Sequence, residues 1–175
     1  MIHNDFALLS RRAAVLACAA LLCAAATLKP ADARSGPFVN FHGNWSGSGI
    51  IRVKDDNTSK LSTERMRCSA AYRQSSSSDV NLKLVCKSDS YSLDLTGDFA
   101  ADAKGHITGD WTEHTRNVGG NVVGQARGSH LVVHAESPVL NANLSMSTYR
   151  HSQSVRLKAA GGGQQVSASI HLRRR

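Results

Sequence analysis

His130 and His134 have the spacing closest to that of a metal site. On a β-strand, residues four apart share a face but lie roughly 13 Å from each other, too far for both to bind one ion. A site would therefore need ligands from neighbouring strands, and the two cysteines after residue 33 are expected to be joined in a disulfide. We predict solvated surface histidines, no metal site and no cofactor.

Among the acidic residues, Glu113 is the strongest candidate for catalysis, because it continues the apolar side of its segment after Trp111. It would lie at the mouth of the fold or pair with a nearby arginine. General acid–base catalysis needs two ionisable groups that converge in a concave site, and the other acids fall in turns or on the polar face. The sequence also contains no nucleophile elbow, phosphate loop or zinc-protease motif. We predict no catalytic residues and a protein that is not an enzyme.

Residues 1–33 have the features of a cleaved signal peptide. The basic pair Arg11-Arg12 precedes an apolar run over residues 13–28, and Ala31-Asp32-Ala33 is a small-x-small cleavage site. We expect cleavage after Ala33 and a periplasmic or secreted single domain formed by residues 34–175. The apolar run is short for a membrane span of roughly 20 residues, so we do not expect the mature chain to span a membrane. The general and the twin-arginine export routes both fit the basic pair.

The mature chain is basic. The signal peptide takes with it three of the 21 Lys and Arg and two of the 13 Asp and Glu, which leaves a net charge of about +7 with histidine neutral. Basic clusters occur at Arg65, Arg67 and Arg73 and in residues 173–175. Such charge attracts anionic lipid or polysaccharide of the cell envelope. Few aromatic rings are available for base stacking, and export removes the chain from the cytoplasm, so we predict no nucleic-acid partner.

Apolar and polar residues alternate along most of the mature chain, a period of two that predicts β-strands. No segment of ten or more residues shows a helical period. Short, turn-rich links separate the segments, which favours an all-β, antiparallel up-and-down meander. A meander of about 8–10 strands avoids exposed edges by closing into a barrel. The opposite face is charged and therefore unsuited to contact with hydrocarbon.

Cys68 and Cys86 predict one disulfide and with it the register of one hairpin. The midpoint of the two cysteines is Ser77, which lies inside the turn-forming run at residues 74–79. The same register pairs Ala70 with Leu84 and Tyr72 with Leu82, all on the apolar face.

Gly43-Asn44-Trp45, together with the basic residues 173–175, resembles the lipocalin and wider calycin pattern. The resemblance implies that Trp45 closes one end of a barrel and that an arginine of the last strand packs across it. The chain also resembles a group of uncharacterised small exported alphaproteobacterial proteins. The matching motifs are Trp45-Ser46-Gly47, the two cysteines, Trp111-Thr112-Glu113 and Gln153-Ser154-Val155. This group has no assigned activity.

These observations predict a binding or structural protein that holds a small apolar or amphiphilic ligand inside the barrel. Glycine and alanine at inward positions would leave space; they are Gly43, Gly47, Ala70, Gly97 and Gly109. The predicted ligand-binding residues are Trp45, Tyr72, Leu84, Leu93, Trp111 and Leu144. A barrel filled by its own side chains fits the pattern equally well. Two further alternatives are an envelope-associated factor and a periplasmic protein-binding module. The module could be a protease inhibitor that inserts residues 34–40 into a protease.

Overall fold

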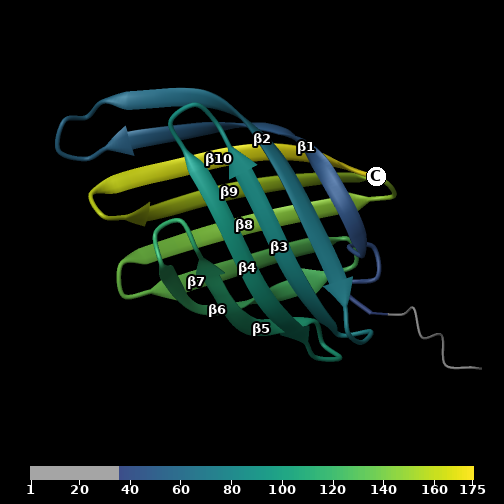
Figure 1. Cartoon of the computed structure of the whole chain (residues 1–175). Coiled ribbons are helices and arrows are strands. Elements are labelled where there is room, and N and C mark those ends of the chain that lie inside the picture. Colours follow the sequence, from purple (N-terminus) through teal and green to yellow (C-terminus); the bar gives the residue numbers. More distant parts are fainter. Residues whose placement is uncertain (1–35) are drawn as a thin grey trace, which may run out of the picture. The chain divides into compact units, whose positions relative to one another are not determined.

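Ten β-strands follow one another along residues 36–175, the part of the chain that the computed structural model describes (Figure 1). The predicted signal peptide and its cleavage site after Ala33 lie outside the described residues. The strands are β1 (Gly43–Asp55), β2 (Leu61–Gln74), β3 (Asp79–Lys87), β4 (Ser92–Ala101), β5 (His106–Glu113), β6 (Val118–Arg127), β7 (His130–Ser137), β8 (Leu140–Tyr149), β9 (Ser152–Gly161) and β10 (Gln164–Arg174). No helix that could cross a membrane occurs in this part of the chain.

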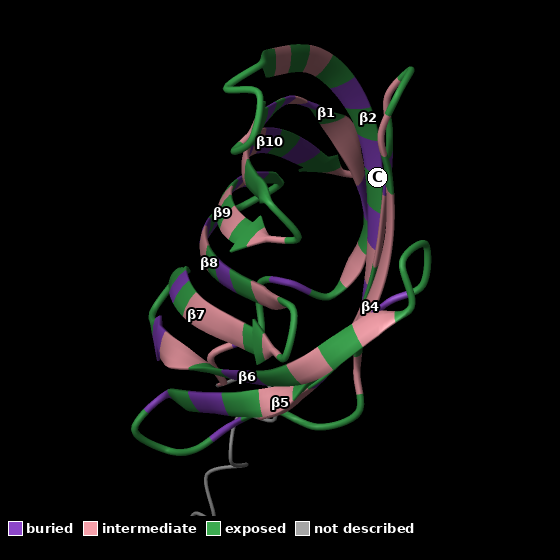
Figure 2. Cartoon of the chain, turned by 90° about the vertical axis from the view of Figure 1, so that its left-hand side faces the viewer, coloured by how far each residue is buried: buried purple, intermediate pink, exposed green. Residues whose placement is uncertain are grey.

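Each strand pairs antiparallel with its neighbours in the sequence, and β1 also pairs with β10. The sheet therefore closes on itself, and the predicted all-β meander barrel is confirmed with ten strands. Closure satisfies the backbone hydrogen bonds that the first and last strands would otherwise leave exposed at sheet edges. Along the strands, buried and exposed residues alternate, as Figure 2 shows.

The β2–β3 hairpin has the predicted register. Cys68 lies directly opposite Cys86 and forms a disulfide with it, Ala70 lies opposite Leu84, and Tyr72 opposite Leu82. In the connecting turn, the Ser76 hydroxyl accepts hydrogen bonds from the backbone N–H groups of Ser78 and Asp79, both at 3.1 Å. A short polar turn is thus held by its own serine, as is common for serine in turns.

The meander gives the barrel two ends with different burial. The end that holds the start of β1 and the β2–β3, β4–β5, β6–β7 and β8–β9 turns, here called the closed end, is filled by buried side chains such as Val80, Ile107 and Leu172. The opposite end, here called the open end, holds the β1–β2, β3–β4, β5–β6, β7–β8 and β9–β10 turns. Toward it, inward-facing residues such as Leu93 and Leu157 remain only half-buried.

Three of the four inward glycines, Gly47, Gly97 and Gly109, do not create free space, contrary to the sequence prediction. A Cβ at Gly47 would collide with the backbone of His171 on β10, and one at Gly97 with the ring of Phe99. The missing side chains therefore let neighbouring strands and Phe99 approach closely, the role of glycine in strongly coiled strands. Ala70 is buried and is not part of the cavity wall described below.

Candidate ligand cavity

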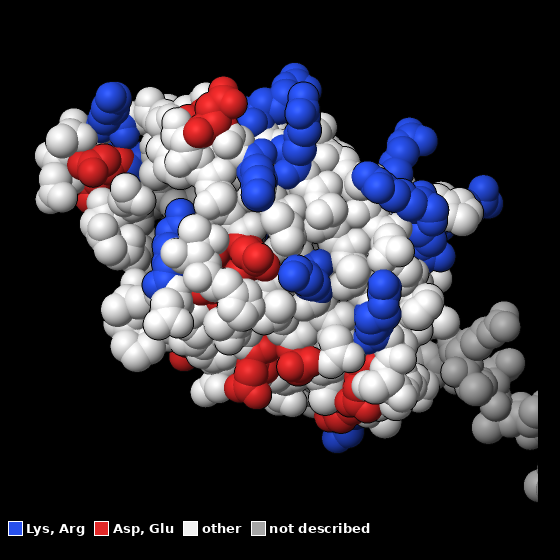
Figure 3. All heavy atoms as spheres, in the orientation of Figure 1, with Lys and Arg blue, Asp and Glu red and all other residues white. Residues whose placement is uncertain are grey.

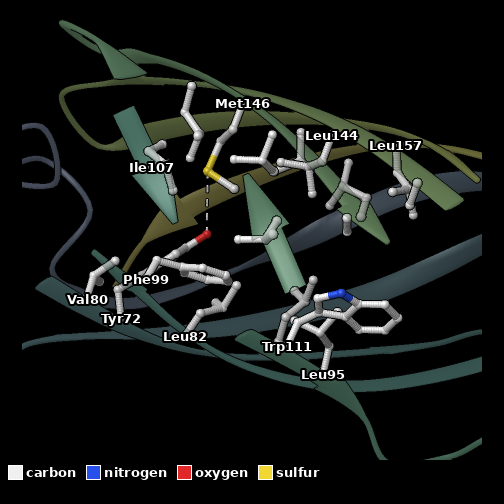
Figure 4. A pocket seen from close by; sticks show the side chains of 18 of the residues that line it. Tyr72, Val80, Leu82, Leu95, Phe99, Ile107, Trp111, Leu144, Met146 and Leu157 are labelled. Carbon is white, nitrogen blue, oxygen red and sulfur yellow. Dashed lines mark hydrogen bonds between the residues drawn. The ribbon is translucent and has the colours of Figure 1, made fainter. Parts of the chain in front are cut away.

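The barrel encloses an apolar cavity. Its volume is about 170 Å³. Twenty-five residues line it, and among them only Tyr72, Trp111 and Glu113 carry a side-chain nitrogen or oxygen. Figure 4 shows the wall formed by Tyr72, Val80, Leu82, Leu95, Phe99, Ile107, Trp111, Leu144, Met146 and Leu157.

An aromatic cluster plugs the closed end. Phe38 and Phe41, from the segment just before β1, pack edge-to-face on each other, and Phe41 packs in the same way on Tyr72. Trp45 lies behind them, 1% exposed, with its ring edge-to-face on Tyr72 and its Nε1–H donated to the Phe41 carbonyl at 2.8 Å. Edge-to-face packing of this kind suits the charge distribution of aromatic rings.

Arg174 covers the outer side of Trp45. Its guanidinium carbon lies 4.7 Å from the centroid of the Trp45 ring, a cation–π contact, and the side chain also donates to the Asn40 carbonyl. The lipocalin-like resemblance left three arginines open for this position, and the structure places Arg174 there.

A chain of polar side chains lies behind the plug. The Tyr72 hydroxyl donates to Gln153 Oε1 at 2.9 Å, and Gln153 Nε2 donates to Thr148 Oγ1 at 3.1 Å. All three residues are buried, and burial raises the pKa of Tyr72 above its ordinary value, so its hydroxyl stays protonated. Sequence reasoning missed Gln153 and Thr148. The sequence held one signal for this site, because Gln153 is a polar residue on the same side of its segment as Val155.

Glu113 holds the β5–β6 turn. Its carboxylate accepts the backbone N–H groups of Asp94 at 3.1 Å, Thr115 at 3.0 Å and Arg116 at 2.9 Å. The Arg116 guanidinium adds an ion pair at 3.3 Å. Burial by itself would raise the pKa of Glu113, but these hydrogen bonds outweigh it and the pKa lies below its ordinary value. Of the two sequence alternatives for Glu113, the arginine pair is present, and the residue also belongs to the cavity wall.

The cavity wall includes five of the six predicted ligand-binding residues. Tyr72, Leu84, Leu93, Trp111 and Leu144 line it, whereas Trp45 is separated from it by Phe41 and Tyr72. Phe38 and Phe41 also line the cavity but were not among the predicted binding residues. Phe41 begins the alternation of the first strand on its apolar side, whereas Phe38 lies outside any alternation that marks an inward face.

Both histidines of β7 contact polar neighbours. His130 Nδ1 lies 2.9 Å from the Ser147 hydroxyl. His134 lies within 3.0 Å of Asn143 Oδ1 and 2.8 Å of Glu136 Oε1, and these two hydrogen bonds raise its pKa above the ordinary value. Within residues 36–175, no three His, Cys, Asp or Glu side chains are grouped in a way that could hold a metal ion.

Solved structures share this fold at low sequence identity. Rv2717c from M. tuberculosis aligns with a TM-score of 0.59 and 13% identity over 78% of this chain and 93% of its own. The S-type phycobiliprotein lyase from Guillardia theta aligns with a TM-score of 0.57 and 9% identity over 79% of this chain and 90% of its own. No protein-family model matches the chain, and no curated protein does.

These similarities support the fold alone. Together with the strand order, they define the class of this protein as a closed, ten-stranded antiparallel β-barrel. The resemblance to exported alphaproteobacterial proteins stays a prediction.

Proposed function

We propose that this protein is an exported, non-catalytic carrier that binds a small apolar or amphiphilic ligand inside its barrel. The observation that carries the proposal is the cavity itself. Protein interiors are normally packed as densely as organic crystals, with few voids larger than a water molecule. Here about 170 Å³ remains open behind an almost entirely apolar wall. An engineered apolar cavity of about 150 Å³ in another protein stays dry and binds benzene.

The distribution of burial supports a binding barrel over a filled one. Side chains that fill a barrel would be buried along its whole length. Instead Leu82, Leu84, Leu144 and Leu157 face inward and are only half-buried, although they belong to the central and open parts of the wall. Transfer of an apolar molecule from water to these surfaces is favourable by roughly 25 cal/mol for each Å² of apolar area removed from water.

A cavity-filling variant tests the proposal. Leu144→Trp should occupy the cavity, whereas Val132→Trp, at an exposed position on the neighbouring strand β7, should not. We expect toluene, an uncharged probe of suitable size, to give saturable NMR shifts at cavity-lining amides of the wild-type protein. The affinity should fall at least tenfold in Leu144→Trp and stay within about twofold in Val132→Trp, both checked for native folding by circular dichroism. Absence of saturable shifts in the wild-type protein, or equal binding by both variants, would contradict the proposal.

The protease-inhibitor alternative is not favoured. It requires the segment at residues 34–40 to project from the barrel and enter a protease. In the described part of this segment, Phe38 is 1% exposed and packs against Phe41 inside the closed end. Withdrawing it would expose the aromatic cluster to water.

The outer surface favours a second candidate function. Five neighbouring strands, β9, β10, β1, β2 and β3, present ten exposed Lys and Arg side chains and contain three acids, Asp55, Glu64 and Asp79. The ten are Arg52, Lys54, Arg65, Arg67, Arg73, Lys83, Lys87, Arg156, Lys158 and Arg173. The other five strands contain one arginine, Arg127, and five acids. In Figure 3 the charged side chains in the lower part of the molecule, over β4 and β5, are mainly acidic (red), and those in the upper right part are mainly basic (blue).

We propose that the ten listed side chains, here called the basic face, hold the protein at an anionic lipid surface. Many Lys and Arg side chains on one side of a protein attract a negatively charged surface through their summed electric field. Binding to vesicles that contain anionic lipid, and its loss at high salt, tests this role.

A further inference from the structure

One buried donor in the cavity wall has no partner. Trp111 is 6% exposed, and its Nε1–H has no hydrogen-bond acceptor within residues 36–175. Buried tryptophans usually find an acceptor for this group, and a buried donor left without one costs free energy. The other tryptophan of the described chain, Trp45, follows the rule and donates to the Phe41 carbonyl.

The residues directly opposite Trp111 have no side chain that could supply the missing acceptor. Directly opposite Trp111, β4 carries Gly97 and β6 carries Gly120. Figure 4 shows the Trp111 ring among the inward side chains, with the indole nitrogen on the ring edge that faces the interior. The acceptor must therefore come from within the cavity.

The other polar atoms of the cavity wall are already in use. The Tyr72 hydroxyl donates to Gln153, and both oxygens of Glu113 accept backbone N–H groups. Two more buried side-chain atoms in the described chain lack partners, Asp94 Oδ1 and Arg174 Nε, but neither residue lines the cavity. The interior therefore offers a ligand one free donor, Trp111 Nε1–H.

We propose that the cavity takes a neutral, mainly apolar ligand with one oxygen acceptor, such as a ketone, ester or ether oxygen, which accepts the Trp111 Nε1–H. This inference rests on the proposed carrier function and specifies its ligand class. Glu113 lies two residues from Trp111 on the same face of β5, roughly 7 Å along the strand. A carboxylate on the ligand would lose its hydration in this apolar interior without a cationic partner, because Arg116 is already paired with Glu113, and burial of an unpaired charge is costly.

Acetophenone and α-methylstyrene form a matched pair of probes, because they differ only in a carbonyl oxygen against a methylene group. In ¹⁵N-labelled protein, acetophenone should move the Trp111 indole N–H proton resonance downfield, and α-methylstyrene should not. The indole resonance of Trp45, whose donor is already bonded, serves as the internal reference and should stay in place with both probes. This measurement uses the unaltered protein.

The variant Trp111→Phe keeps an aromatic ring and removes the donor. We expect it to weaken acetophenone binding about three- to tenfold more than it changes α-methylstyrene binding, because both probes experience the altered wall but only acetophenone loses a hydrogen bond. Benzoate, the carboxylate analogue, should bind more weakly than acetophenone to the wild-type protein.

The outcomes separate the two proposals. If both probes bind and shift the Trp111 resonance equally, or if benzoate binds as tightly as acetophenone, the ligand class is wrong while the carrier function stands. If neither probe binds, the carrier function fails and the ligand class with it. If Leu144→Trp binds neither acetophenone nor α-methylstyrene, the binding site lies in the cavity. If this variant still binds both probes, the inference is overturned.

Discussion

At the scale of single residues, the polar side chains of the interior differ in whether they have hydrogen-bond partners. Tyr72, Gln153 and Thr148 satisfy one another, and Glu113 is satisfied by three backbone N–H groups and Arg116. Trp111 alone among the polar residues of the cavity wall keeps a free donor. Because unsatisfied buried groups are rare in folded proteins, the exception marks the position where a ligand is expected to bind.

The carboxylate of Glu113 makes stability depend on acid pH. The pKa of Glu113 is lower in the folded than in the unfolded state. The ionised carboxylate therefore contributes fully to the free energy of unfolding at pH values above its pKa in the unfolded state, about 4.3. This contribution is lost as the pH falls through the lower pKa that Glu113 has in the folded protein. We expect Glu113→Gln to be less stable than wild type at pH 7, by about 1–3 kcal/mol, with a difference that shrinks below pH 4.

Urea unfolding at several pH values measures this difference. The exposed, outward Asp110→Asn on the same strand is the control and should leave stability nearly unchanged. A constant difference for Glu113→Gln from pH 7 to pH 3 would contradict the assigned hydrogen bonds.

At the scale of elements, the β2–β3 hairpin is held by both its turn and its disulfide. Closing the loop between Cys68 and Cys86, which are 18 residues apart, contributes on the order of 3 kcal/mol by the chain-entropy estimate. We expect Cys86→Ser to lower the melting temperature clearly, and reduction of the wild-type protein to have a similar effect. In the double serine variant, reductant should change nothing. An unchanged melting curve for Cys86→Ser would contradict the role of the disulfide.

The segment before β1 is the second element with a clear energetic role, because Phe38 and Phe41 plug the closed end. Phe38→Ala removes a ring that is 1% exposed and should cost about 3–5 kcal/mol of unfolding free energy. Val39→Ala, at the exposed neighbouring position, should cost less than about 0.5 kcal/mol. Denaturant unfolding compares the two variants. Equal stability would show that the plug is not packed as described.

At the scale of the whole molecule, the barrel has an apolar interior and an outer surface with a basic half and an acidic half. We expect binding to vesicles containing phosphatidylglycerol at low salt and none to vesicles of phosphatidylcholine. Binding should weaken steeply as the ionic strength rises, because the Debye length is about 10 Å at 0.1 M and about 3 Å at 1 M. Co-sedimentation with the vesicles measures it.

The basic face predicts which substitutions matter for this binding. Reversing Arg65 and Arg67 to Glu should abolish vesicle binding, whereas reversing Arg127, on the acidic half of the barrel, should have little effect. Salt-independent retention, or equal loss in both variants, would contradict the role of the basic face.

The strands, their antiparallel order and the β2–β3 register were predictable from the chain alone. Alternation with period two is a local property, because successive side chains of a strand point to opposite faces. Register follows locally as well where two cysteines lie symmetrically about a turn, as Cys68 and Cys86 do around Ser77. The same alternation identified Tyr72, Leu84, Leu93, Trp111 and Leu144 as inward-facing.

The plug, the free donor and the empty volume were decided only by the tertiary structure. Phe38 carries no periodic signal, and its position depends on the rim that ten strands form around it. The free donor of Trp111 depends on what two other strands place beside it. Whether a barrel is hollow depends on the summed volume of side chains from every strand and on strand coiling, and no single segment contains that sum.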